Sequence, residues 1–340
     1  MNNMVAIKKD LLPKMQNIAA ASADDVGKAL AAAYHDNAEW RGAHPLNEMS
    51  GLAALTEKVW RPLLTAMPDL ERRDVIFIGG ETKGKTQVAA LGHYLGTFKN
   101  DWLGIPASGG AVYLRYGEVH EIVNGKIARS SAIWDLLNLM RQVGIWMLPP
   151  SMGSEEMWPC PLSADGVVLT ETTPEESQKS VATVLAMHQS LQDYDDTKDR
   201  SRQGLIDMPQ KKYWHPKMMW YGPAGIGTSR GLEGFVDVHQ LPFRQAMPNR
   251  LGLGHYVCFG DGKYSVTGGW PSVRADHKFG DWMGMPPTGQ ILNMRVMDFY
   301  LNDEGLIREN WIPLDIIDIL RQMGTDVFAR LRAMRKVRRI

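Results

Sequence analysis

The stretch Asp101-Trp102-Leu103-Gly104-Ile105-Pro106 returns 180 positions later as Asp281-Trp282-Met283-Gly284-Met285-Pro286. The same shift, applied without gaps, brings Ala66-Met67-Pro68 onto Ala246-Met247-Pro248. From residue 35 to residue 144, 23 of 110 positions are then identical, and the identities form ordered motifs that include the rare residue tryptophan. A period this long indicates two copies of a whole domain rather than a solenoid of short repeats.

Length and composition agree with two globular domains. The chain has 340 residues, more than one hydrophobic core usually spans, and 44% of them are hydrophobic. A stretch rich in proline, glycine and serine follows the first copy, from Leu148 to Pro161. We therefore predict a first domain over residues 1–150, a linker over 151–173 and a second domain over 174–340.

The charge balance argues against one class of function. Lysine plus arginine and aspartate plus glutamate number 38 each, which argues against a nucleic-acid-binding protein. No apolar run is long enough to span a bilayer, and the two cysteines form no disulfide framework or zinc motif. We expect a cytoplasmic protein. A basic cluster ends the chain, and we interpret it as a solvated helix end: Arg330, Arg332, Arg335, Lys336, Arg338 and Arg339.

The order of elements in one copy predicts an α+β roll. Helices come first, at residues 23–34 after Ser22 and at 52–66, with a short strand at 38–42 between them. Four strands follow, at 73–78, 87–98, 111–123 and 126–134, and a short helix at 136–143 closes the copy. Turns are expected at Gly79-Gly80 and Asn124-Gly125. The second copy has a longer helical lead-in, at 174–206. In such a roll a curved antiparallel sheet wraps the helices into a cone whose mouth is a pocket.

Several motifs carry a family resemblance. Those of the second copy are Trp220-Tyr221-Gly222-Pro223, Gly268-Gly269-Trp270-Pro271, 284–289, 294–300, Asn310-Trp311 and Leu314-Asp315. They resemble SnoaL-like polyketide cyclase domains of the nuclear transport factor two-like superfamily, over about residues 24–144 and 180–328. The resemblance implies tandem cone-shaped rolls that pair as an internal pseudo-dimer. It leaves the function open, because the superfamily includes cyclases, isomerases, epoxide hydrolases, dehydratases and binding modules.

Two aspartates begin the closing helices. Asp135 and Asp315 correspond in the repeat, and each stands where the last strand enters the short helix. The resemblance implies that an aspartate in this segment is a general acid/base, a role that an apolar pocket would favour by raising its pKa. The alternative is a helix N-cap, which explains both residues without catalysis.

Two further acids lie in the middle of the long fourth strand. Glu118 and Asp298 correspond, and strand alternation places Asp298 on the face of Tyr300 and Glu118 on the face of His120. A carboxylate there is costly unless it faces water, a cation or a pocket. The pattern therefore fits either a pocket or a salt-bridged sheet face. Arg115 and Arg295 lie on the opposite face, where we expect sheet packing or a pairing across domains.

Aromatic residues and histidines supply the candidate substrate contacts. Large rings along a cone suit a flat hydrophobic ligand, although ordinary core packing could use them too. The candidates are Trp40, Trp102, His120, Trp220, His239, Trp270, His277, Trp282, Tyr300 and Trp311. His35 and His215, just before the first strand of each copy, are interpreted as structural. No histidine and carboxylate pair has a metal-ligand spacing, so we predict no metal and no other cofactor.

Three functions stay open at this level. The first is a cofactor-free enzyme that cyclises, isomerises or dehydrates a small hydrophobic carbonyl compound. The second is a ligand-binding or scaffold protein, and the third an epoxide or ester hydrolase in the same pocket. The copies differ in sequence, with Ser130-Ser131 where the second has Asn310-Trp311 and Leu91-Gly92-His93 where it has Pro271-Ser272-Val273. We therefore expect the main pocket in copy two. Further association into homo-oligomers is compatible with the resemblance.

Overall fold

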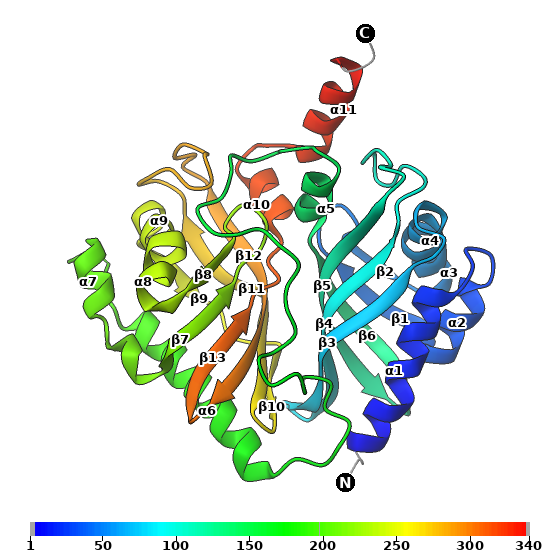
Figure 1. Ribbon diagram of the computed structural model, residues 1–340, viewed down its shortest axis with the longest axis horizontal. Coiled ribbons are helices and arrows are strands. Elements are labelled where there is room, and N and C mark those ends of the chain that lie inside the picture. The colour runs from blue at the N-terminus through cyan, green and yellow to red at the C-terminus, as the bar shows by residue number, and fades with distance from the viewer. Residues whose placement is uncertain (1–3, 197, 338–340) are drawn as a thin grey trace. The chain divides into compact units, whose positions relative to one another are not determined.

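Two mixed sheets organise the chain (Figure 1). A computed structural model describes residues 4–196 and 198–337. The chain divides into two compact units, each with one sheet and its own helices, so the predicted tandem α+β class is confirmed. The pseudo-dimeric pairing of the copies stays a prediction.

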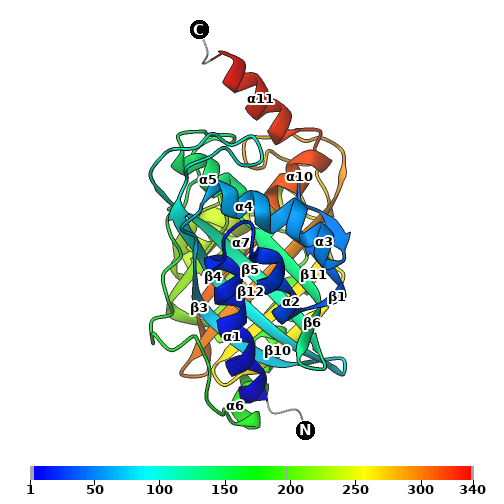
Figure 2. The ribbon, with the colours of Figure 1, turned by 90° about the vertical axis from the view of Figure 1, so that its right-hand side faces the viewer.

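The sheet of unit 1 has the strand order β2-β1-β6-β5-β4-β3. Strands β3 to β6 form an antiparallel meander, and β1 pairs with β6 in parallel. The strands are β1 (Tyr34–Gly42), β2 (Glu48–Ser50), β3 (Glu71–Thr82), β4 (Lys85–Thr97), β5 (Ala111–Val123) and β6 (Lys126–Trp134). The helical elements are α1 (Met4–Ala20), α2 (Val26–Ala33), α3 (Leu52–Leu55), the π-helical η1 (Thr56–Trp60), α4 (Arg61–Ala66) and α5 (Leu136–Gln142). Figure 2 shows α1 to α4 in front of this sheet.

The sheet of unit 2 repeats that plan, in the order β10-β11-β12-β13-β7-β8 with β9 paired to β11. Its strands are β7 (Trp214–Tyr221), β8 (Thr228–Arg230), β9 (Leu251–Gly252), β10 (Val257–Asp261), β11 (Tyr264–Asp276), β12 (Ile291–Asp303) and β13 (Leu306–Trp311). Its helical elements are α6 (Pro174–Gln192), α7 (Arg202–Asp207), η2 (Pro209–Lys212), α8 (Gly231–Phe235), the π-helical η3 (Val236–Gln240), α9 (Leu241–Ala246) and α10 (Ile316–Gln322).

Neither unit is one continuous stretch of chain. Unit 1 comprises Met1–Met147 together with Leu162–Glu171 and Asp326–Ile340. The middle segment adds a parallel bridge from Val167 to Phe77 of β3, and the last carries α11 (Val327–Val337). Unit 2 comprises Leu148–Pro161 and Thr172–Thr325, and its first segment bridges to β8 through Ser154 and Thr228.

Two expectations about local structure are wrong. The Gly79-Gly80 pair does not turn, because β3 runs through it to Thr82. Gly79 instead lets α1 lie close to the sheet, since a Cβ there would meet the Sδ of Met4 at 2.4 Å. Helix α1 itself is the second surprise, because it gives copy one a long leading helix like α6 of copy two. The two copies therefore do not differ at their starts as expected.

Smaller differences concern the ends of elements. Helix α2 begins at Val26, and Ser22 accepts the backbone N–H of Asp25 in the turn before it. His35 and His215 lie within β1 and β7 rather than before them. Arg330, Arg332, Arg335 and Lys336 belong to α11, where Arg335 pairs with Asp101 at 2.6 Å, whereas Arg338 and Arg339 lie outside the described residues. Within the described part of the chain, no helix combines the length and apolarity needed to cross a membrane.

Candidate functional site

One carboxylic acid occupies the same place in each sheet. Glu118 of β5 stands opposite Ala90 of β4, and Asp298 of β12 stands opposite Thr267 of β11. Residues that pair across neighbouring strands form a row. In unit 1 one row consists of Trp40, Ser130 and His120. The matching row of unit 2 consists of Trp220, Asn310 and Tyr300. Residues in such a row share a face, and the acids lie two positions away on that same face.

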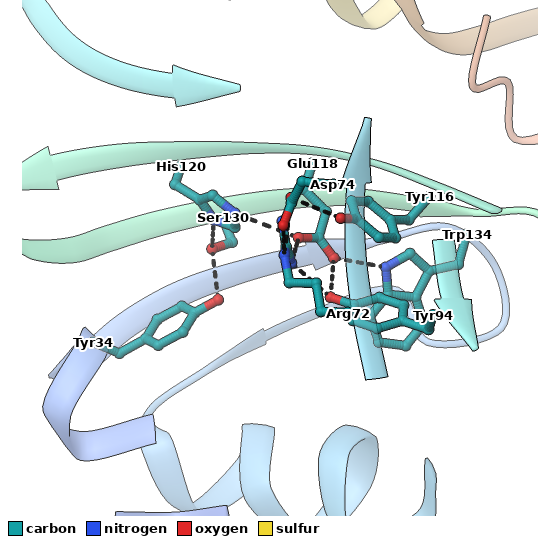
Figure 3. A network of polar contacts seen from close by, with 9 residues as sticks. All are labelled: Tyr34, Arg72, Asp74, Tyr94, Tyr116, Glu118, His120, Ser130 and Trp134. Carbon is teal, nitrogen blue, oxygen red and sulfur yellow. Dashed lines mark hydrogen bonds and ion pairs between the residues drawn. The ribbon is translucent and has the colours of Figure 1, made fainter. Parts of the chain in front are cut away.

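In copy one this acid is the centre of a buried polar network (Figure 3). The Arg72 guanidinium donates to Glu118 at 2.7 Å and also forms an ion pair with Asp74 at 2.8 Å. The Tyr94 hydroxyl and the Trp134 indole N–H donate to the other Glu118 oxygen at 2.8 and 2.9 Å. Burial alone would raise the pKa of Glu118, but Arg72 and His120 outweigh it and hold that pKa well below its usual range.

The same network fills the interior around the acid. Tyr116 donates to Asp74 at 2.7 Å, and its ring lies 4.5 Å from the Arg72 guanidinium carbon. A chain of contacts continues from His120 to Ser130 at 2.8 Å and from Ser130 to Tyr34 at 3.0 Å. Trp40 and Trp102 pack on Trp134 with ring centroids 6.0 and 6.3 Å apart. The side chains of the network are buried, and Glu118 is 2% exposed. Copy one therefore holds a buried, ionised carboxylate whose charge is balanced by Arg72.

Copy two lacks the groups that close copy one. Tyr94 pairs with Arg72 across β4 and β3, and the corresponding pair across β11 and β9 is Val273 with Gly252. Tyr116 pairs with Trp134, and the corresponding bridge joins Val296 to Leu314. Val273, Val296, Leu314 and Asp298 are all half-buried rather than buried. Copy two thus has a glycine in place of the arginine, and aliphatic side chains in place of the three large rings, around its acid.

The strand register also corrects the ungapped comparison of the copies. Gly92 stands opposite Tyr116 and Gly269 stands opposite Val296, so these glycines correspond. The pairing of β11 then shifts between Gly269 and Val273, across Trp270-Pro271-Ser272. The ungapped match of Leu91-Gly92-His93 to Pro271-Ser272-Val273 was wrong, because copy two has a bulge there.

Asp298 has two polar neighbours, Asn310 and Tyr300. Burial raises its pKa to about 7, and hydrogen bonds from Asn310 and Tyr300 only moderate that rise. Among the residues that the structure describes, no lysine or arginine forms an ion pair with it. The Tyr300 hydroxyl lies 2.9 Å from Nε2 of His188 on α6, whose own pKa burial and the neighbouring His255 lower to about 4. Asp298 is thus a half-buried carboxyl that changes protonation near neutral pH.

Aromatic rings from the helices cover the same face. His239 of η3 is stacked between Trp220 and Phe243, with ring centroids 4.5 and 5.4 Å away. The ring of Trp282 lies 5.6 Å beyond Phe243. Because Trp220 shares a row with Asn310 and Tyr300, this aromatic stack and Asp298 belong to one side of the sheet.

The other candidates of copy two lie elsewhere. Trp270 packs against Arg295, with the guanidinium carbon 5.1 Å from the ring, and Arg295 is on the opposite face of β12 from Asp298. Trp311 stacks on Tyr221 at 5.0 Å, one position off the row of Asn310. His277 follows β11 and contacts Thr288 at 3.2 Å. The structure therefore places Asp298, Tyr300, Trp220, His239 and Trp282 on one side of the sheet, whereas Trp270, Trp311 and His277 contact other partners.

Asp135 and Asp315 begin their helices as side-chain caps. Asp135 accepts the Asn138 backbone N–H at 3.0 Å, and Asp315 accepts that of Asp318 at 3.2 Å. Asp135 also pairs with Arg115, and Asp315 with Arg295 at 3.2 Å. Each of these arginines therefore pairs with the aspartate twenty residues later in its own copy. The pairing across domains stays a prediction.

Several residues of both sites cannot be identified from the sequence alone. Only the strand pairing brings Arg72, Asp74 and Tyr94 of copy one to Glu118. In copy two, strand pairing brings Asn310 to the site and the packing of α6 brings His188 to Tyr300, and neither is visible in the sequence alone. The sequence does contain one signal for Arg72. The position 180 residues later is Gly252, so copy two keeps the acid at Asp298 but lacks the arginine.

Comparison with known proteins now gives the family. The model of SnoaL-like polyketide cyclases matches residues 13–143 and again residues 207–323, together more than half of the chain. The chain belongs to the SnoaL-like polyketide cyclase family. Each copy is one SnoaL-like domain. No curated protein matches the chain.

Solved structures similar to the chain correspond to single domains. TsrD from Streptomyces laurentii is 22% identical and covers 41% of this chain and 96% of its own, with a TM-score of 0.34. A candidate SnoaL-like polyketide cyclase from Jannaschia sp. CCS1 is 14% identical, covering 46% of this chain and 98% of its own, with a TM-score of 0.35. An NTF2-like protein from Burkholderia xenovorans LB400 is 12% identical, covering 43% and 97%, with a TM-score of 0.33.

Proposed function

We propose that copy two is a cofactor-free acid/base site for a small hydrophobic carbonyl compound, with Asp298 as the group that moves the proton. The observation that carries this proposal is the state of Asp298. It is half-buried, forms no ion pair with a lysine or arginine that the structure describes, and has a pKa raised to about 7 by burial. A general base works best when its pKa lies near the working pH, because it is then ionised often enough and still basic.

The chemistry is proton transfer at carbon. Ionised Asp298 takes a proton from the carbon next to the carbonyl group, and the electron pair of that C–H bond moves into an enolate. Returning the proton at another carbon isomerises the compound, and attack of the enolate on a second carbonyl of the same molecule closes a ring. Membership of the SnoaL-like family supports this class of reaction, and no redox step or co-reactant is required.

Copy one has a structural role in this proposal. Its equivalent acid, Glu118, is ion-paired to Arg72 and surrounded by the rings of Tyr94, Tyr116 and Trp134. A carboxylate held ionised in that way is a weak base, and 2% exposure leaves a substrate no access to it. Asp135 and Asp315, as helix caps paired to arginines, serve to hold the last helices.

The test is a comparison of three proteins with a panel of hydrophobic ketones, polyketide-like aromatics, steroids and epoxides. Binding is measured by tryptophan fluorescence, and product analysis follows on each ligand that binds. We expect Asp298→Asn to bind as wild type does and to convert about 10²–10⁴-fold more slowly. The matched variant Asp315→Asn keeps the shape of the side chain and an oxygen that can accept the Asp318 backbone N–H, so it should retain conversion.

The opposite pattern contradicts the proposal. Conversion at the wild-type rate by Asp298→Asn, with loss in Asp315→Asn, would move the chemistry to the helix cap. If every bound ligand is recovered unchanged from wild type, the second candidate stands instead, a small-ligand-binding protein. Release of diols from the epoxides alone would assign a hydrolase in which the carboxylate activates water.

A further inference from the structure

The position of His239 differs between the copies in a way that points to a ligand. It is the fourth residue of η3, and the fourth residue of η1 is Val59, which is fully buried in copy one. The next residue is Trp60 in copy one, whose ring packs on Tyr94 and Trp134 at 5.7 and 5.8 Å. In copy two that place belongs to Gln240, which turns to accept from Arg244 at 2.7 Å. Copy two thus has a half-buried imidazole where copy one has a buried apolar side chain.

The His239 ring is fixed in orientation by its stacking. Trp220 and Phe243 cover its two faces with interplanar angles of 17° and 18°. Only the edge of the ring, which carries the two nitrogens, is left for hydrogen bonding. The ring is also neutral, because burial and the nearby Arg244 and Arg250 lower its pKa to about 3.

One nitrogen of this edge makes no hydrogen bond to the part of the chain that the structure describes. Nδ1 is buried and has no hydrogen-bond partner among the described residues. A neutral imidazole has one N–H and one lone pair. Leaving a buried N–H unsatisfied is costly, so the hydrogen belongs on Nε2, at the part of the edge that is not enclosed. The ring is half-buried, and its stacking on Trp220 places it on the side of the sheet that carries Asp298, so its N–H donor has a fixed orientation there.

We propose that His239 binds the carbonyl oxygen of a planar, enolisable ketone through Nε2–H while Asp298 removes the proton from the adjacent carbon. This inference rests on the proposed function and assigns its substrate class and its oxyanion donor. As the C–H bond breaks, the electron pair moves through the new C=C bond onto that oxygen. A neutral donor suits this task, because it stabilises the developing charge without giving up its own proton to the weaker base.

Naphthols test the inference, because their ionised oxygen lies in the plane of a ring and mimics an enolate. The probes are 2-naphthol, more acidic ring-substituted naphthols, and naphthalene as the reference without oxygen. Dissociation constants are measured by tryptophan fluorescence in Asp298→Asn, which holds a neutral group at the acid. His239→Phe and His239→Gln are added to this background, and His215→Gln, at an imidazole of β7 bound to the Lys217 backbone N–H, is the control.

We expect Asp298→Asn to bind the naphthols more tightly as their acidity rises. Adding His239→Phe should weaken the most acidic naphthol about 10- to 100-fold, abolish the dependence on acidity and leave naphthalene binding unchanged. His239→Gln keeps a donor and should retain most of the affinity, and His215→Gln should change nothing. In the Asp298→Asn protein, the Nε2 proton of His239 should shift downfield in a nitrogen-edited NMR spectrum when naphthol binds, a readout that needs no variant of His239.

Two results overturn the inference alone. One is equal binding of all naphthols with and without His239→Phe, and the other is an equal loss of naphthol and naphthalene, which would show a packing role. Failure of Asp298→Asn to bind naphthalene or any naphthol would instead remove the site itself and with it the proposed function.

Discussion

At the scale of single residues, one pair of equivalent acids has two environments. Glu118 and Asp298 occupy the same strand position, yet Arg72 faces the first and a glycine, Gly252, takes that place beside the second. The cation decides the protonation state, because burial alone favours the neutral acid. The same fold thus makes an ionised, closed carboxylate in copy one and a proton-exchanging carboxyl in copy two.

Arg72→Met tests this electrostatic account in copy one. The variant leaves the Glu118 carboxylate buried without its cation, so we expect it to cost about 3–5 kcal/mol in the free energy of unfolding. Adding Glu118→Gln should restore part of the loss, as measured by chemical denaturation in a double-mutant cycle. The wild-type Glu118 pKa is depressed, so its stabilisation is present above about pH 4.5, the ordinary value, and is lost as the pH falls. The gap between wild type and Arg72→Met should therefore narrow in acid, and additive effects at neutral pH would refute the coupling.

At the scale of elements, the sequence predicted strands and turns better than it predicted contacts between elements. The bounds of β5 and β6 were predicted as observed because Asn124-Gly125 marks their hairpin. Gly79-Gly80 carries the same kind of local signal, but Gly79 serves the approach of Met4 on α1, a contact between elements that no local pattern reveals.

The site shows the same limit. The positions of Glu118 and Asp298 in their strands, and the faces on which they lie, followed from the alternation of side chains along a strand. Which acid had a cation did not, because Arg72 reaches Glu118 only through the register of β3, β4 and β5. The bulge at Trp270-Pro271-Ser272 changed the alignment of the copies for a similar reason, since an ungapped comparison cannot see a local insertion.

At the scale of the whole molecule, the final helix belongs to the first unit. Leu331 of α11 is fully buried, and Arg335 forms an ion pair with Asp101 and donates to the Gly104 carbonyl at 3.0 Å. Unit 1 therefore includes α11 in addition to its own repeat. Repetition at 180 residues could predict two domains, but not that α11, which follows the second repeat, belongs to the first unit.

Leu331→Ala checks this assignment. The lost burial and the cavity should destabilise unit 1 by about 2–5 kcal/mol. Hydrogen exchange should accelerate at β4 and β5, with little change at β12 and β13. Arg332→Ala, whose side chain is 64% exposed, is the control and should leave exchange unaltered. Faster exchange confined to unit 2 would show that α11 stabilises the other unit.

The ionisation of Asp298 is the central claim, and a carbon-13 NMR titration of its carboxyl measures it without any substrate. Asp298→Asn identifies the resonance by its disappearance. The account predicts a midpoint near pH 7, raised from the ordinary value of 3.8 because burial disfavours the charge. A midpoint near 4 would show that Asp298 is solvated or paired like an ordinary surface carboxylate, and the acid/base proposal for copy two would be contradicted.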